Sequence, residues 1–153
     1  MKPLQRVLLT ADAMPGESVA ALFFSDQKPL QGPAALLDWR LEGQLTRMLL
    51  DGKVHGHAGE HVVLQNNGKL QADWALLVGG GKWHGLCLDT YAALVRHMLK
   101  VAAQAGFRDV SLTFMPHAEA TPDFLQQQIE NVLAAEGLGI ETCRFSCEPI
   151  VSV

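Results

Sequence analysis

The chain has 153 residues, 48% of them hydrophobic and 18% charged, which is the length and balance of one folded domain spanning residues 1–153. Twelve Lys and Arg residues against sixteen Asp and Glu give a net charge of −4, which argues against a nucleic-acid-binding protein. No run approaches the ~18 consecutive apolar residues of a membrane span. With three cysteines, an odd number, we expect a cytoplasmic protein with reduced thiols and no membrane association.

The first third of the chain predicts two strands and one long helix. Residues 4–10 and 20–25 are apolar runs of strand length. A helix is predicted from Gly32-Pro33, because proline suits the first helical position, to Asp51-Gly52. The apolar stripe of this helix recurs at spacings of three and four residues, at Ala34, Leu37, Leu41, Leu45 and Met48.

The middle of the chain predicts a strand pair and a second helix. Residues 60–65 and 74–78 are strand-like, and the turn signal Asn66-Asn67-Gly68 lies between them. The second strand is wholly apolar after Trp74, which is typical of a strand covered on both faces. A helix capped by Asp89 or Thr90 is then predicted to end at Gly106.

The last third predicts a strand over 109–115, a helix from Thr121-Pro122 to Gly137, and a final strand over 140–147. Strands and returning helices therefore alternate along the whole chain. Such alternation favours an α/β fold of three layers, with a central mixed sheet of about six strands flanked by helices.

Three spaced motifs in this sequence resemble the N-terminal domain of the leucyl aminopeptidases, the cytosol aminopeptidase family. That domain has a helix of the form L-D-x-x-L-x-G-x-L, then a G-K-x-G-E loop, then an L-V-G-L-G-K turn. The corresponding residues here are Leu37, Asp38, Leu41, Gly43 and Leu45; Gly56, Gly59 and Glu60; and Leu77, Val78, Gly79, Gly81 and Lys82. The resemblance implies a macro-domain-like fold.

The resemblance also implies that the catalytic half of the family enzymes is missing. Those enzymes hold two metal ions in a C-terminal domain with a signature like N-T-D-A-E-G-R, and no such signature occurs here. Two-metal hydrolysis needs several converging carboxylates, whereas the acidic residues of this chain are scattered. We therefore expect a non-catalytic domain with no cofactor, standing alone as a chain.

Family enzymes are hexamers with peripheral N-terminal domains, so the resemblance favours an assembly or regulatory module that self-associates or binds a protein partner. The alternative is a macro-like domain that binds a small ligand such as a nucleotide or an ADP-ribose derivative. A DNA-binding regulator and an accessory part of an aminopeptidase are further hypotheses, the first of which the acidic charge disfavours. Trp74 is expected to be a partly buried core residue, whereas Trp39 and Trp83 are left open as interface anchors.

Two glycine-bearing loops contain the candidate ligand-binding residues, because ligands of α/β sheets gather near the carboxyl ends of strands. Both loops also depart from the family pattern: His57 stands where lysine is usual, and Gly80 stands where a second hydrophobic residue is usual. Glycine-rich turns can present backbone N–H groups to phosphate. The favoured alternative is that Gly79, Gly80 and Gly81 only turn the chain tightly. The candidates are Gly56, Gly59, Glu60, Gly79, Gly80, Gly81, Lys82 and His84.

The segment H-G-H-A-G-E-H carries the candidate metal ligands His55 and His57. Imidazole and carboxylate groups suit zinc or nickel. However, strand alternation would put Glu60 and His61 on opposite faces, and the resemblance associates no metal with this loop. We therefore expect solvated loop histidines rather than a metal site.

Overall fold

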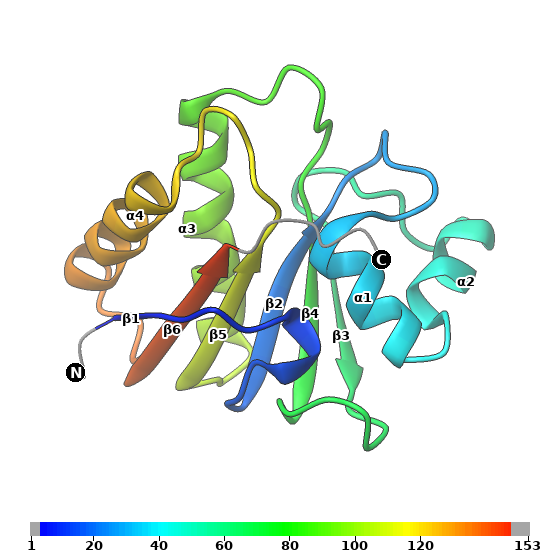
Figure 1. Ribbon diagram of the computed structural model, residues 1–153, viewed down its shortest axis with the longest axis horizontal. Coiled ribbons are helices and arrows are strands. Elements are labelled where there is room, and N and C mark those ends of the chain that lie inside the picture. Colours follow the sequence, from blue (N-terminus) through cyan, green and yellow to red (C-terminus); the bar gives the residue numbers. More distant parts are fainter. Residues whose placement is uncertain (1–3, 148–153) are drawn as a thin grey trace.

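Six strands form one mixed sheet in the computed structural model, which describes residues 4–147 (Figure 1). The strand order is β1-β6-β5-β2-β4-β3, and every neighbouring pair is parallel except β3 and β4, which are antiparallel. The strands are β1 Gln5–Arg6, β2 Ser18–Phe23, β3 His61–Gln65, β4 Trp74–Gly79, β5 Asp109–Phe114 and β6 Thr142–Cys147. The predicted mixed sheet is confirmed.

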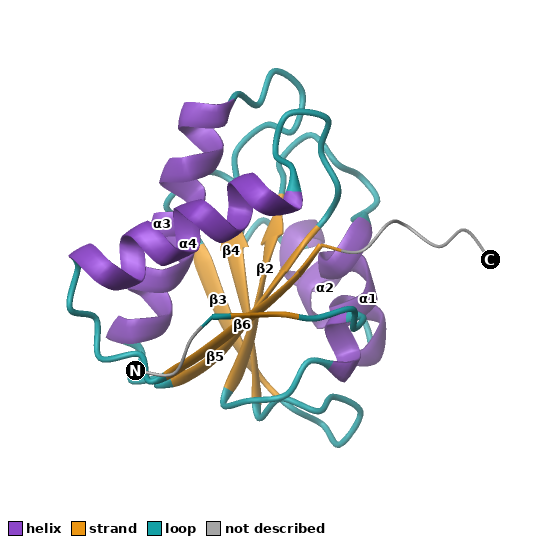
Figure 2. Cartoon of the chain, turned by 60° about the vertical axis from the view of Figure 1, so that its left-hand side comes forward, coloured by secondary structure: helices purple, strands orange, loops and turns teal. Residues whose placement is uncertain are grey.

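Helices cover both faces of the sheet, as Figure 2 shows nearly edge-on: α3 and α4 lie on one side, α1 and α2 on the other. Their bounds are α1 Gly32–Arg40, α2 Gln44–Leu50, α3 Leu88–Gln104 and α4 Pro122–Ala135. Strand β2 contributes alternate residues to the two cores: Ala20 and Leu22 to the core with α3 and α4, Ala21 and Phe23 to the core with α1 and α2. The wholly apolar strands of the sequence follow from this double coverage.

The first strand is much shorter than the strand predicted over residues 4–10. Only Gln5 and Arg6 form β1, and the next residue, Val7, donates its N–H to the carbonyl oxygen of Phe145 at 2.9 Å. The chain then leaves the sheet, so Leu8 is 81% exposed. A short 3-10 helix, η1 Ala11–Ala13, follows and was not predicted.

The long helix predicted over 33–51 is two helices with a break between Arg40 and Gln44. The break has left-handed backbone at Glu42 (φ 62°) and Gly43 (φ 75°). Leu37, Leu41 and Leu45 are nevertheless all fully buried, since the turn preserves their spacing toward the core. An apolar stripe therefore does not distinguish one helix from two.

Asp38 holds the two helices at this break. Its buried carboxylate accepts hydrogen bonds from the backbone N–H of Leu45 at 2.8 Å and of Thr46 at 3.2 Å, and from the Thr46 hydroxyl. These donors lie in the first turn of α2, where backbone N–H groups have no intrahelical acceptor. In this chain the motif L-D-x-x-L-x-G-x-L thus encodes a buried leucine row, a carboxylate cap and a left-handed turn at Gly43.

The remaining helix starts were predicted to within two residues. Thr121 caps α4 by accepting the Phe124 N–H at 3.1 Å on its hydroxyl oxygen. Helix α3 begins at Leu88 after Cys87, slightly before the predicted caps. Within the described part of the chain, no helix is both long and apolar enough to cross a membrane.

Candidate functional site

The two candidate loops meet at one edge of the sheet, where β2 and β4 end and β3 begins. The Gly79 N–H donates to the Glu60 carbonyl and the Gly81 N–H to the Gly56 carbonyl, both at 2.8 Å. We call residues 55–60 the histidine loop and residues 79–84 the glycine turn. Because β3 runs antiparallel to β4, the loop that precedes β3 lies beside the carboxyl ends of the parallel strands.

The backbone N–H groups of the three glycines are all used within the chain. Besides the two bonds to the histidine loop, the Gly80 N–H donates to the Phe23 carbonyl at 2.9 Å. A Cβ on Gly79 would overlap the carbonyl oxygen of His57, and a Cβ on Gly80 would overlap the Phe24 ring. The first two glycines therefore allow close packing of buried backbone and ring, and none of the three amides points freely at a ligand.

Asp26 occupies two further backbone donors of the glycine turn, those of Trp83 and His84. Its carboxylate accepts the N–H of Trp83 at 2.8 Å and of His84 at 3.0 Å. Desolvation raises the pKa of Asp26, but the hydrogen bonds from His84 and Trp83 outweigh it and hold that pKa below its ordinary value. A fixed anion of the chain itself thus lies where a glycine-rich turn would bind a phosphate.

A crevice lies at the carboxyl ends of β2 and β5, whose following helices, α1 and α4, pack on opposite faces of the sheet. Such a switch point is where open α/β sheets place ligands. Here the cavity is only about 10 Å³, close to the space of one water molecule. Trp83 forms part of the wall of the crevice, with its ring centroid 5.1 Å from that of Phe24 and 4.7 Å from that of His117.

Burial also fixes the protonation of Tyr91, a residue that lines the same crevice. Desolvation raises the pKa of Tyr91 far above its ordinary value, so this phenol stays neutral. By contrast, the sequence candidates Lys82 and His84 are exposed at the rim of the glycine turn. The sequence did not single out Asp26, Tyr91 and His117 as site residues. Asp26 and His117 lie shortly after the ends of β2 and β5, and Tyr91 lies within α3, which is the only indication that the sequence carries.

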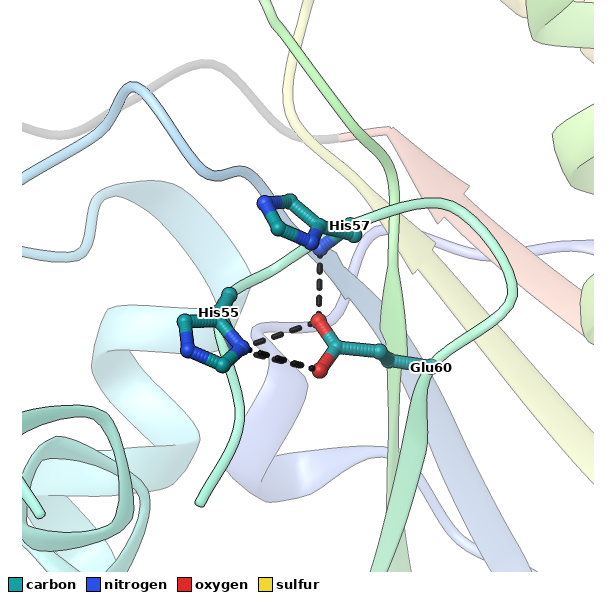
Figure 3. A group of neighbouring side chains, drawn as sticks. All are labelled: His55, His57 and Glu60. Carbon is teal, nitrogen blue, oxygen red and sulfur yellow. Dashed lines mark hydrogen bonds and ion pairs between the residues drawn. The ribbon is translucent and has the colours of Figure 1, made fainter. Parts of the chain in front are cut away.

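The histidine loop brings together three possible metal ligands (Figure 3). The ligand atoms of His55, His57 and Glu60 all lie within 4.8 Å of one another, and His55 Nδ1 is 3.5 Å from Glu60 Oε2. The predicted strand alternation of Glu60 and His61 does not apply here, because Glu60 lies in the loop before β3, which begins at His61. Gly59, with φ 98° and open space around it, provides the turn.

Glu60 organises this loop through the loop's own backbone. Its Oε1 accepts the N–H of His57 at 2.7 Å and of His55 at 3.0 Å. Desolvation raises the pKa of Glu60, but hydrogen bonds from His57 and His55 outweigh it, so that pKa lies below its ordinary value. The carboxylate is therefore ionised at neutral pH.

One of the three tryptophans, Trp74, differs from expectation, and the structure now places the two that the sequence left open. Trp74, predicted in the core, lies at the surface and is 36% exposed, since it begins β4 at the opposite end of the sheet. Trp39 on α1 is 70% exposed and carries the Arg40 guanidinium 4.9 Å above its ring. Trp83 is the half-buried tryptophan that packs against the core.

This arrangement of sheet and helices is a macrodomain-like α/β fold. Over 94% of this chain and 63% of the other, the fold matches a Trypanosoma brucei macrodomain solved in complex with ADP-ribose, with a TM-score of 0.68 and 15% identity. A mutant of tomato leucine aminopeptidase matches over 94% of this chain and 32% of its own length, with a TM-score of 0.70 and 14% identity.

Comparison of the sequence with family models identifies the family of this chain. The family described as "Cytosol aminopeptidase family, N-terminal domain" matches residues 21–138, and the chain belongs to that family. A relative named "Probable cytosol aminopeptidase" from Actinobacillus pleuropneumoniae serotype 5b (strain L20) is 31% identical over 85 residues, which cover 56% of this chain and 17% of the relative. The match thus spans about a sixth of that relative's length. The family match confirms the resemblance to the N-terminal domain.

Proposed function

We propose that this chain is a non-catalytic assembly module, one domain over residues 1–153, that pairs with a second copy of itself through α1 and α2. The observation that supports this proposal most directly is the exposed Trp39, which lines a groove of about 380 Å³. The groove is lined by Pro29, Leu30, Ala35, Trp39, Gly43 and Thr46, among others.

The non-catalytic part of the proposal rests on what the matched region contains. The family match is to the N-terminal domain. Within residues 4–147, the single group of three or more possible metal ligands is His55, His57 and Glu60, which includes one carboxylate. Two-metal hydrolysis requires two ions about 3.5–4 Å apart, and one carboxylate with two imidazoles does not hold such a pair.

The self-association part rests on complementarity within one patch. Trp39 is an exposed aromatic side chain, and the groove beside it is a hollow of largely apolar walls. A two-fold axis through such a patch lets each copy insert its tryptophan into the groove of the other, because an isologous interface uses the same surface twice. Arg40 already restrains the Trp39 indole, which lowers the entropy lost when the ring docks.

Sedimentation equilibrium over a wide concentration range tests this proposal. We expect a monomer–dimer equilibrium that Trp39→Ala weakens at least ~30-fold, since truncating a buried interface tryptophan costs about 2 kcal/mol or more. Trp74→Ala is the matched control, because Trp74 is an exposed tryptophan that does not line the groove, and this variant should dimerise as the unaltered chain does. A monomer at every concentration, or equal dimerisation of Trp39→Ala, would refute the proposal.

A second candidate function, binding of a nucleotide or an ADP-ribose derivative, draws support from the macrodomain neighbour solved with ADP-ribose. In this chain Trp83 would have to leave the crevice between β2 and β5. Thermal unfolding with and without millimolar ADP-ribose, for the unaltered chain and for Trp83→Ala, tests this function. No stabilisation of either protein would rule it out at that concentration.

A further inference from the structure

We propose that His55, His57 and Glu60 form a binding site for a divalent transition-metal ion of the zinc type, with a fourth position open to solvent. This site is separate from the α1–α2 surface of the proposed function. It lies on the histidine loop at the carboxyl edge of the sheet (Figure 3).

The spacing of the ligand atoms suits a zinc ion. Zn²⁺ binds nitrogen and oxygen ligands at about 2.0–2.2 Å in a tetrahedron, so neighbouring ligand atoms lie roughly 3.3–3.6 Å apart. His55 Nδ1 and Glu60 Oε2 are 3.5 Å apart, already at that separation. The full set of ligand atoms lies within 4.8 Å, so rotation of the exposed His57 ring closes the remaining gap.

The loop backbone that presents these ligands is fixed before any ion binds. Glu60 is held by two backbone N–H groups on Oε1, while Oε2 faces His55 and accepts one long bond, from the His55 N–H at 3.2 Å. The Gly79 and Gly81 N–H groups tie the loop to β4 and the glycine turn. Gly56 packs so tightly that a Cβ there would lie 2.8 Å from the backbone nitrogen of Ser25.

The charge and ring arrangement also favour a cation. Among the described residues, Glu60 forms no ion pair with a lysine or arginine, and the imidazole within ion-pair distance of its carboxylate is that of His55. The His55 and His57 rings stack nearly parallel, with centroids 5.2 Å apart and planes at 15°. Two imidazoles and one carboxylate are a ligand set that zinc enzymes use with an open fourth position.

Calorimetric titration of tag-free protein with Zn²⁺ tests the site. We expect saturable binding of one ion, weakened at least tenfold by His55→Ala and by His57→Ala. His61→Ala is the matched control, because it removes an exposed histidine next to Glu60 that lies outside the cluster, and it should bind as the unaltered chain does. Glu60→Gln keeps an acceptor oxygen for the loop and should also weaken binding, since it removes the charge.

Proton NMR of the six histidines provides a second measurement that needs no variant to fold. Saturating Zn²⁺ should shift the ring protons of His55 and His57 and leave those of His84, His97 and His117 unchanged. Absence of saturable binding would overturn the proposal. Equal binding by the His55→Ala, His57→Ala double variant, or equal shifts of the His84, His97 and His117 ring protons, would overturn it as well.

Discussion

Replacing Gly79 by alanine tests whether the glycine turn is built for packing or for a ligand. The added Cβ would overlap the His57 carbonyl, a backbone atom that cannot turn aside. Overpacking of this kind costs about 1–3 kcal/mol. Moving the loop also strains two hydrogen bonds, from Gly79 to Glu60 and from Gly81 to Gly56, worth about 1 kcal/mol each. From the overpacking and the two strained hydrogen bonds together, we expect Gly79→Ala to lower the free energy of unfolding by about 3–5 kcal/mol.

Urea denaturation followed by circular dichroism measures this loss, with Gly81→Ala as the matched control. Gly81 has φ 78°, but an added Cβ would lie 4.0 Å from its nearest neighbour, Ala58, so alanine there costs only the left-handed backbone strain of about 1–2 kcal/mol. If Gly79→Ala loses no more stability than Gly81→Ala, the packing explanation is wrong. A glycine reserved for the close approach of a ligand would show that result, with a loss of binding alone.

Three further predictions concern stability and thiol chemistry. Asp38→Ala removes the carboxylate cap of α2 and should lower the free energy of unfolding by about 1–2 kcal/mol, or roughly 2–8 °C in Tm; an unchanged Tm would contradict the cap. Backbone hydrogen bonds from Arg108 and its neighbour hold the pKa of Glu17 below its ordinary value. The stability they provide is present above the ordinary glutamate pKa of about 4.3 and is lost as pH falls through the lower folded value. Urea midpoints should therefore fall more between pH 6 and pH 3 for the unaltered chain than for Glu17→Gln, and parallel curves would refute this. Burial raises the pKa of the Cys143 thiol to about 12, whereas a hydrogen bond with the Thr90 hydroxyl holds the pKa of the exposed Cys87 below its ordinary value. Iodoacetamide at pH 8, read by peptide mass spectrometry, should therefore label Cys87 first, and early labelling of Cys143 would contradict the buried position.

The sequence predicted the central strands of the sheet well because they are short apolar runs between clear turn signals. Residues 74–78 and 109–115 were found almost to the residue, since a doubly covered strand leaves an unbroken apolar run. The break between α1 and α2 was missed because Leu37, Leu41 and Leu45 keep a helical spacing through it. Glu42, in a left-handed conformation, carries no local signal of the turn.

The candidate site was predicted less completely, because it depends on contacts between segments far apart in the sequence. That the histidine loop and the glycine turn lie near the strand ends followed from the order of elements. The pairing of Asp26 joins it to Trp83 and His84, which are 57 and 58 positions away, and no local pattern encodes it. The turn at Gly59 brings Glu60 back toward His55, and the periodicity of the sequence does not predict the direction of that turn.

Asp26 has a consequence for any anion that approaches the glycine turn. A carboxylate that the fold holds against its two donors acts as an internal competitor, with an effective concentration on the order of millimolar or higher. A free phosphate group must outcompete this resident carboxylate before it can use the same N–H groups. Acquiring an anion-binding turn here would therefore require the loss of one acidic side chain, Asp26, before the gain of any new basic one.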